Sequence, residues 1–247
     1  MKEEEFFQMT KICLLLTSTI NPRDYEFVGR KGIVNRENDY LKAVRFYKTF
    51  GFPIIYIDNS DYVSEQIQSQ ISQIPNSQYL AFDSLESFRG KGHGELEILK
   101  YAFDNSEFLC LCDYFIKISG RYIVTNFADF ISKVDFSINH HFCNLSRNMN
   151  WADSRIVIFE RSFFQKFFVP TLEKYLDEEN GEFFEKSYAR SIHLFQYSGG
   201  KISYWPVYPF YSGINGENGK LISFKFFKRM KYTIYLKLKK YISKQTI

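Results

Sequence analysis

The chain has 247 residues, 19% of them aromatic, a formal net charge of +4, and four cysteines without Cys-x-x-Cys spacing. This length suits one large domain or two small ones, and the cysteine pattern points to buried reduced thiols rather than a disulfide scaffold or a metal site. No apolar run approaches the ~20 residues that span a bilayer. Nine Lys and Arg and no acidic residue lie from Lys220 to Ile247, so subtracting nine from the net +4 leaves residues 1–219 with −5.

The first half of the chain alternates short apolar runs with segments of helical spacing. Strands are predicted at 12–16, 53–57 and 79–82, with one or two more within 108–124. Helices are predicted between them, at 38–50, 61–73 and 95–103. This order predicts a mostly parallel sheet with helices on both faces.

Beyond residue 124 the pattern becomes α+β. We expect a short helix or turn at 127–131, an irregular loop at 137–149, and strands at 155–159 and 202–208. Helices are expected at 162–176, with a kink or break near Pro170, and at 183–194. A glycine-rich loop at 213–219 follows a group of aromatic residues, Tyr204, Trp205, Tyr208, Phe210 and Tyr211. Such rings stack well on sugars, but core packing explains most of them more simply.

Charged and polar residues gather where the predicted strands end. In parallel sheets, ligands bind outside the carboxyl ends of the strands. Thr17, Asp58, Asp83 and the segment from Lys117 to Arg121 all fall at such ends. We therefore expect a binding site at this edge of the sheet.

Two glycine-containing basic segments are the strongest candidates for binding phosphate. The first runs from Arg89 to Glu95 (Arg-Gly-Lys-Gly-His-Gly-Glu) and would open a helix, whose N-terminus favours anions. The second, Lys117-Ile-Ser-Gly-Arg121, would close a strand. Together they predict a cradle for a diphosphate, although a glycine-rich basic loop alone is commonly an ordinary surface turn.

Several motifs, in this order along the chain, resemble those of bacterial surface-polysaccharide (capsule or O-antigen type) glycosyltransferases with a GT-A-like fold. They are Thr17-Ser-Thr-Ile-Asn-Pro22, Asp58-Asn-Ser60, Lys91-Gly-His-Gly-Glu95, Lys117-Ile-Ser-Gly-Arg-Tyr122 with Asn126, and Gly181-Glu-Phe-Phe-Glu185. The resemblance implies an α/β, GT-A-like (Rossmann-related) fold. In it, a mostly parallel central sheet is flanked by helices and followed by an α+β acceptor-side half.

The resemblance also implies roles for individual residues. Thr17 and Asp58 would hold the nucleoside, although an Asx turn explains Asp58 equally well. Glu185 would be the general base of an inverting transfer, with Asp153 and Glu182 as alternatives. The residues expected to bind the rest of the donor, a UDP-sugar by preference, are Arg89, Lys91, Gly92, Gly94, Glu95, Lys117, Gly120 and Arg121.

The metal motif of these enzymes, Asp-x-Asp, has no counterpart at the matching place, where Lys117 to Arg121 stand instead. This departure argues against a divalent metal (Mg or Mn), and no cofactor is firmly implied. Lys and Arg can offset the negative charge of a leaving diphosphate, so we predict a metal-independent transfer and no metal site.

The basic tail predicts an amphipathic helix over 222–247, with Phe224, Phe227, Ile234, Leu238 and Ile242 on one face. An anionic membrane surface is the expected partner, and the acidic body argues against nucleic acid. A simple packed C-terminal helix is the alternative. The predicted organisation is one catalytic domain over 1–219, with a donor half to about 126 and an acceptor half from about 127, followed by the tail 220–247.

The expected function is transfer of a sugar from a nucleotide donor to a lipid-linked or oligosaccharide acceptor, in the cytoplasm at the inner face of the cell membrane. Two alternatives stay open: a nucleotidyl- or phosphotransferase that uses the same phosphate cradle, and a non-catalytic membrane-associated assembly protein. The residues do not indicate the sugar, the linkage or the oligomeric state.

Overall fold

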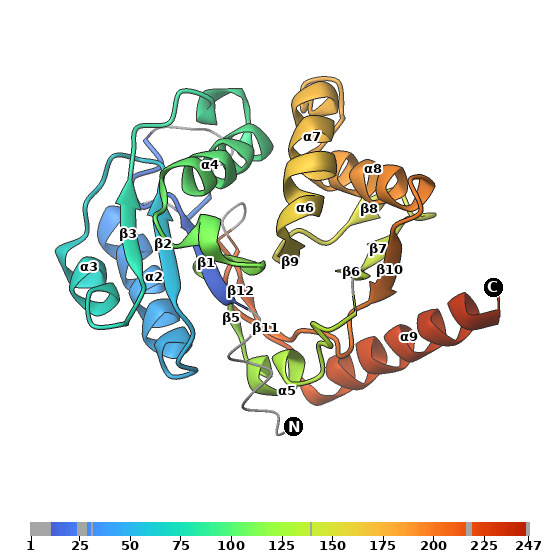
Figure 1. Cartoon of the computed structure of the whole chain (residues 1–247). Coiled ribbons are helices and arrows are strands. Elements are labelled where there is room, and N and C mark those ends of the chain that lie inside the picture. Colours follow the sequence, from blue (N-terminus) through green and yellow to red (C-terminus); the bar gives the residue numbers. More distant parts are fainter. Residues whose placement is uncertain (1–10, 24–28, 31, 139, 216–218, 246–247) are drawn as a thin grey trace.

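The computed structural model describes residues 11–23, 29–30, 32–138, 140–215 and 219–245. Its centre is a five-stranded sheet in the order β3-β2-β1-β4-β9 (Figure 1). Four strands run parallel, namely β1 (Ile12–Ser18), β2 (Ile54–Asp58), β3 (Gln78–Ala81) and β4 (Tyr114–Ser119). The fifth, β9 (Ile156–Glu160), pairs antiparallel with β4. The predicted mostly parallel sheet is therefore confirmed.

Helices cover both faces of this sheet, because both sides of its strands are apolar. In β1, Leu14 and Leu16 join one core while Cys13 and Leu15 join the other, and all four are fully buried. The first core is closed by α2 (Ile33–Lys48), α3 (Glu65–Ile71) and α5 (Phe127–Ile131). The second is closed by α4 (Lys91–Asn105), α7 (Val169–Tyr175) and α8 (Phe184–Tyr197). The predicted fold class is confirmed.

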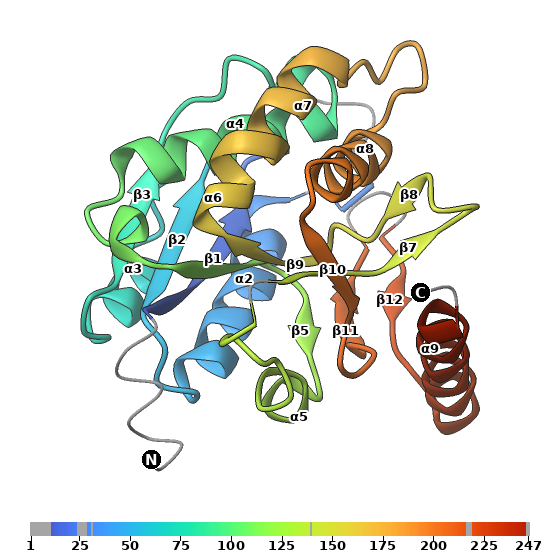
Figure 2. The same cartoon turned by 45° about the vertical axis from the view of Figure 1, so that its right-hand side comes forward.

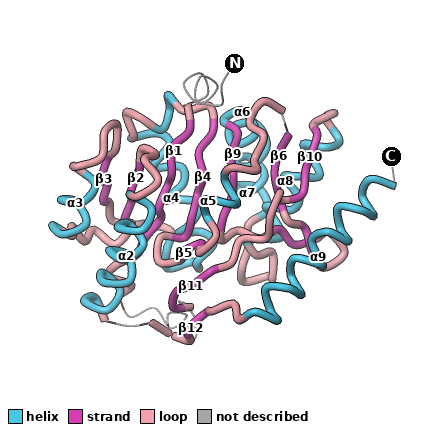
Figure 3. The backbone as a smooth tube through the Cα atoms, turned by 90° about the horizontal axis from the view of Figure 1, so that it is seen from below, coloured by secondary structure: helices cyan, strands magenta, loops and turns pink. Residues whose placement is uncertain are grey.

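Smaller sheets extend the molecule beyond β9. Strand β6 (His140–Cys143) pairs parallel with β10 (Lys201–Tyr204), and the two continue the row of strands next to β9 (Figure 3). Three short strands form an antiparallel sheet, β5 (Ile123–Val124), β11 (Tyr211–Ile214) and β12 (Leu221–Ile222). A further pair is β7 (Leu145–Ser146) with β8 (Trp151–Ala152).

Two helical regions differ from the prediction in detail. The chain from α6 (Arg161–Phe163) to α7 is continuous, because a π-helical stretch at Phe164–Phe168 joins them and Pro170 falls at the start of α7. A proline inside a continuous helix lacks one N–H and crowds the preceding turn, and the wider π-helical turns directly before Pro170 accommodate it. The last helix, α9 (Phe226–Gln245), lies within the predicted tail. None of the helices in the described part of the chain combines the length and hydropathy needed to cross a bilayer.

The prediction of an irregular loop over 137–149 is wrong, because this segment contains β6 and β7. Polar residues in this segment, including two adjacent histidines, interrupt the apolar pattern by which a buried strand is recognised in a sequence. His141 points inward, is 2% exposed, and its ring stacks on Phe163 with 3.8 Å between the ring centres. Its Nε2 lies 2.9 Å from the Tyr188 hydroxyl.

Burial lowers the pKa of His141 to about 3, from an ordinary value of 6.5. The unfolded chain therefore binds a proton that the folded chain refuses, and stability should fall as the pH drops below about 6.5. One such group contributes about 1.4 kcal/mol of unfolding free energy per pH unit. We expect His141→Gln to flatten the pH dependence of urea unfolding between about pH 6 and pH 4.

The less buried His193 supplies the matched control, because His193→Gln also removes one imidazole. Comparing slopes rather than absolute stabilities removes any packing cost of the substitutions. Equal slopes in wild type and His141→Gln would mean that the folded protein accepts a proton at His141.

Candidate active site

Four parallel strands end at one edge of the sheet, as the sequence predicted. The register places Thr17 opposite both Ile57 and Ser119, and Ser18 opposite Asp58. Strand β1 lies between β2 and β4, because the chain runs from β1 through β2 to β3 on one side of β1 and then crosses back to β4 on the other side. A crevice at such a switch point is where α/β sheets bind ligands.

Asp58 is wholly buried at the end of β2 and holds the loop that follows β1. Its Oδ2 accepts hydrogen bonds from Ser18 Oγ and the Ile20 amide, both at 2.7 Å. Its Oδ1 accepts from the amide of Ser60 at 2.9 Å and from the Ser60 hydroxyl. Both carboxylate oxygens therefore bind groups of the chain itself and fix the loop next to the expected nucleoside site. The direct contact of Asp58 with a nucleoside stays a prediction.

Thr17, Glu95 and Lys117 meet above the ends of β1 and β4. The Lys117 side chain is 2% exposed and its Nζ lies 2.6 Å from Glu95 Oε1, which also accepts a hydrogen bond from Thr17 Oγ1 at 3.1 Å. Glu95 belongs to the second turn of α4, so this helix brings its carboxylate to the strand ends. The structure thus unites three predicted site residues that are far apart in the sequence.

Ser154 connects this group to the second half of the chain. Its carbonyl oxygen accepts a hydrogen bond from Lys117 Nζ at 2.8 Å, and its hydroxyl donates to Glu185 Oε1 at 2.9 Å. Ser154 is positioned here because it precedes β9, whose antiparallel pairing brings its first residues to the carboxyl end of β4. Ser154 alone therefore bridges the buried ammonium group of Lys117 and the carboxylate of Glu185, the predicted base.

The N-terminus of α4 differs from the predicted glycine loop, because the helix already begins at Lys91. Gly94 lies inside the helix, where a Cβ would approach Ser87 Oγ to 2.6 Å, so this glycine allows close packing within the protein. The amide of Gly92 donates to Glu178 Oε2 at 2.9 Å. A carboxylate of the chain thus occupies the helix end where a phosphate was expected, and burial raises its pKa.

The predicted cations have different surroundings. Arg89 lies at the surface, 49% exposed, in an ion pair with Glu86 at 2.6 Å. Arg121 is half-buried, and its Nε and Nη1 are shielded from solvent and have no hydrogen-bond partner among the residues that the structure describes. Its guanidinium carbon lies 5.9 Å from the centre of the Tyr122 ring. Burial acts to lower the pKa of Arg121, but Tyr40, Tyr122 and the Glu95 carboxylate hold it above the ordinary value.

Gly120 explains how Arg121 reaches this position. Its amide donates to the Thr17 carbonyl at 2.8 Å, and a Cβ added to Gly120 would stand 2.6 Å from that oxygen. Only glycine lets the turn after β4 close this tightly on the end of β1. Gly120 therefore fixes the backbone between β4 and Arg121 against the end of β1.

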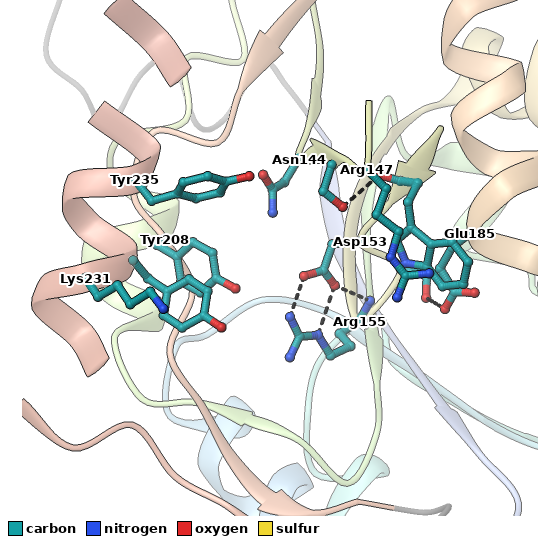
Figure 4. Close-up of a pocket in the computed structure, with 12 residues that line it drawn as sticks. Asn144, Arg147, Asp153, Arg155, Glu185, Tyr208, Lys231 and Tyr235 are labelled. Atoms are coloured by element: carbon teal, nitrogen blue, oxygen red, sulfur yellow. Dashed lines mark hydrogen bonds and ion pairs between the residues drawn. The ribbon is translucent and has the colours of Figure 1, made fainter. Parts of the chain in front are cut away.

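Next to this group, a cavity of about 420 Å³ opens between β7, β8, α8 and α9 (Figure 4). Both predicted catalytic carboxylates, Asp153 and Glu185, line it. Its walls are otherwise polar and aromatic, and consist of Asn144, Ser146, Arg147, Trp151, Ser154, Arg155, Tyr208, Lys231, Tyr232 and Tyr235. The Arg147 guanidinium lies 3.9 Å above the Trp151 ring.

The two carboxylates are held differently. Asp153 Oδ1 and Oδ2 accept bonds from Arg155 Nε at 3.0 Å and Nη2 at 2.5 Å, a bidentate pair. Burial acts to lower the pKa of Arg155, but the Asp153 charge holds it above the ordinary value. Glu185 makes its hydrogen bond to the Ser154 hydroxyl instead. Of the two, Glu185 has the geometry of a group that can take a proton.

Several lining residues were missed by the sequence analysis. Asn144 and Arg147 fall in the segment that was expected to be irregular, Trp151 falls just after it, and Lys231, Tyr232 and Tyr235 fall in the tail. Of the aromatic group that was expected to line an acceptor cleft, Tyr208 lines the pocket although it is only 5% exposed. Trp205, Phe210 and Tyr211 belong to the same core and do not line this pocket. A run of left-handed residues at Arg147, Asn148 and Met149 shapes this wall, and no simple sequence signal marks it.

The residues at the end of β4 do not suit a divalent metal. Lys117 lies in β4 and Arg121 directly follows its end, and positive side chains repel a cation. The described residues contain no cluster of three or more His, Cys, Asp or Glu with the geometry of a metal site.

No family model matches the chain, and no curated protein matches its sequence. Among solved structures, it is similar to a protein described as a nucleotide-diphospho-sugar transferase from Desulfovibrio desulfuricans G20, with 11% identity, 79% of this chain and 80% of that chain covered, and a TM-score of 0.44. It is also similar to the bifunctional glycosyltransferase WbbM, with 12% identity, 94% and 45% covered, and a TM-score of 0.49. A third likeness is to 4-diphosphocytidyl-2C-methyl-D-erythritol synthase from Anaerococcus prevotii, with 16% identity, 94% and 99% covered, and a TM-score of 0.39. At such values the likeness concerns the course of the chain and assigns no activity.

Proposed function

We propose that the protein is a glycosyltransferase that moves a sugar from a nucleotide-diphosphate donor, UDP-sugar by preference, to a glycan or lipid-linked acceptor in surface polysaccharide synthesis. One observation carries this proposal: Ser154 joins Lys117, at the carboxyl end of a parallel strand, to Glu185, in the wall of a pocket. A site for a leaving anion and a base for an incoming hydroxyl thus lie side by side.

Arg121 has the leading role on the donor side. Its guanidinium has unused donors, whereas Lys117 is already paired with Glu95. Guanidinium nitrogens bind two phosphate oxygens at once, and charge-assisted bonds of this kind are the strong ones. As the bond between the sugar C1 and the phosphate oxygen breaks, Arg121 and Lys117 stabilise the negative charge that develops on the diphosphate.

Glu185 has the corresponding role on the acceptor side. In an inverting transfer, the acceptor oxygen attacks C1 from the face opposite the diphosphate and gives its proton to a carboxylate. Ser154 holds one oxygen of Glu185, and the half-buried Trp151 lines the pocket in front of it, where its ring can pack against a sugar. Its volume of about 420 Å³ is in the usual range for small-molecule sites.

The proposal includes a cytoplasmic location at the inner face of the membrane. All four cysteines are free thiols, and three of them are buried, which is consistent with a reducing compartment. The site as described needs no metal ion, because cations of the chain stand at the diphosphate position.

A thermal-shift screen across UDP, GDP, dTDP and CMP tests the donor side directly. We expect UDP at one hundred times its Kd to add about 2.7 kcal/mol of stability and so raise the Tm by roughly 5–10 °C. The shift should persist in EDTA and be lost in Arg121→Gln, while Arg89→Gln, at the surface, should retain it. A shift that disappears in EDTA and returns with Mn²⁺ would overturn the metal-independent site.

A turnover assay with ATP and CTP, run beside this screen, separates the alternatives. Turnover of ATP or CTP without release of sugar would favour a nucleotidyl- or phosphotransferase. No response to any nucleotide would favour a non-catalytic assembly protein, and would end the glycosyltransferase proposal.

A further inference from the structure

Helix α9 exposes a continuous apolar stripe. Five side chains at spacings of three or four residues are between 48% and 77% exposed, namely Phe227, Met230, Ile234, Leu238 and Tyr241. Such spacing places them on one face of a helix. Phe224, which was expected on this face, is instead buried before the helix begins and packs beside Tyr208 and Tyr232.

The opposite face of α9 fixes the helix to the body. Leu236 is 4% exposed and belongs to the main core. Arg229 Nε donates to the carbonyl of Phe224 at 2.9 Å, and Lys240 Nζ donates to the carbonyl of Pro206 at 2.7 Å. Because these contacts set the rotation of the helix, the stripe faces away from the body, along the margin of the molecule where α9 lies (Figures 1 and 2).

Positive charge flanks the stripe. Lys228 and Lys237 are exposed on its two sides, and the exposed Lys231 lies at its margin, next to the pocket. The sequence from Lys220 onward contains nine cations and no acidic residue, while the rest of the chain has a net charge of −5. Nucleic acid would pair with the lysines but leave the apolar stripe in water, whereas an anionic bilayer satisfies both.

We propose that α9 docks on an anionic membrane surface through the stripe Phe227, Met230, Ile234, Leu238 and Tyr241. The helix lies in the plane of the interface with this face among the acyl chains, and its flanking lysines contact lipid headgroups. The body stays in solution on the other side of the helix.

Docking in this orientation would also bring the pocket close to the membrane surface, because α9 forms part of its wall. Lys231, Tyr232 and Tyr235 of α9 form one wall of the cavity that holds Glu185 (Figure 4). If the proposed function is right, on which this step rests, the sugar of a membrane-anchored acceptor reaches Glu185 along α9 without leaving the surface.

Vesicle co-sedimentation of the full chain tests the docking without any enzyme assay. We expect binding to vesicles that contain phosphatidylglycerol and little binding to pure phosphatidylcholine. Ile234→Ser/Leu238→Ser removes two large side chains from the bilayer and should weaken binding roughly 100-fold. Lys228→Gln/Lys237→Gln should weaken it about 30-fold, since each lysine near the surface is worth about fivefold.

Leu85→Ser/Leu111→Ser is the matched control, because these leucines are 75% and 54% exposed but lie outside α9. It should bind vesicles like wild type, and all variants should keep the wild-type Tm. Absence of binding, or equal binding by the stripe variant and the control, would overturn the proposal. So would a dimer in light scattering that the stripe variant dissociates, since a second copy would then cover the stripe. The UDP-induced thermal shift is independent of these outcomes, so the two proposals fail separately.

Discussion

Replacing Glu185 by glutamine is expected to slow sugar transfer by about 10²–10⁴-fold, the usual contribution of a general base. Glutamine keeps the carbonyl oxygen that accepts the Ser154 hydroxyl, so the pocket should retain its shape. The Tm should therefore stay close to that of the wild type. The rate is measured as release of nucleoside diphosphate with saturating donor, and the Tm is recorded alongside.

Glu182→Gln is the control for this experiment. Glu182 lies just before the same helix, at 3.6 Å from Lys186 Nζ and 3.5 Å from Arg190 Nη2, and is 36% exposed. It lies outside the Glu185 cavity, so its substitution should leave the rate within about twofold of wild type. A folded Glu185→Gln variant that keeps half its activity would remove Glu185 from the role, and a large loss in Glu182→Gln would move the role there.

Lys117→Met is expected to have the largest effect on stability, about 3–5 kcal/mol. Methionine matches the length of the lysine stem, but it leaves the Glu95 carboxylate without its buried counter-charge at 2.6 Å. The Ser154 carbonyl loses its donor as well. Urea unfolding at pH 7 measures the change, with Lys100→Met, from an exposed ion pair with Glu173, as the control.

The double variant Lys117→Met/Glu95→Gln separates structure from function. Neutralising both partners removes the unpaired charge, so most of the stability should return. The transfer rate should stay low, because a neutral side chain at 117 no longer offsets the charge of the leaving diphosphate. Recovery of activity together with stability would show that Lys117 has only a structural role.

The strands and most helices could be predicted because each depends on a local pattern. Buried parallel strands have apolar side chains on both faces, so β1 and β2 stand out as continuous apolar runs. The segment that contains β6 lacks this signal, since His141 is buried through one hydroxyl partner and one stacked ring that come from α8 and α6. Only the folded chain brings those partners to it.

The candidate site shows the same division. The sequence indicated that Lys117, Glu95 and Glu185 belong to a site, because charged residues follow predicted strands or open predicted helices. It did not indicate that Lys117 is paired with Glu95, that Glu178 occupies the end of α4, or that Asp153 is held by Arg155. The partners in these pairs are distant in the chain or are brought together by a turn, so the spacing of residues along the sequence does not predict the contacts.

What the sequence determined by itself is therefore the succession of elements, the edge of the sheet where polar groups collect, and the basic character of the last helix. These follow from hydrophobic periodicity and charge, which are properties of neighbouring residues. The tertiary structure alone decided which cation keeps free donors, which carboxylate faces a cavity, and which side of α9 meets solvent. Each of these depends on what packs against a side chain from elsewhere in the chain, and that is settled only when the elements come together.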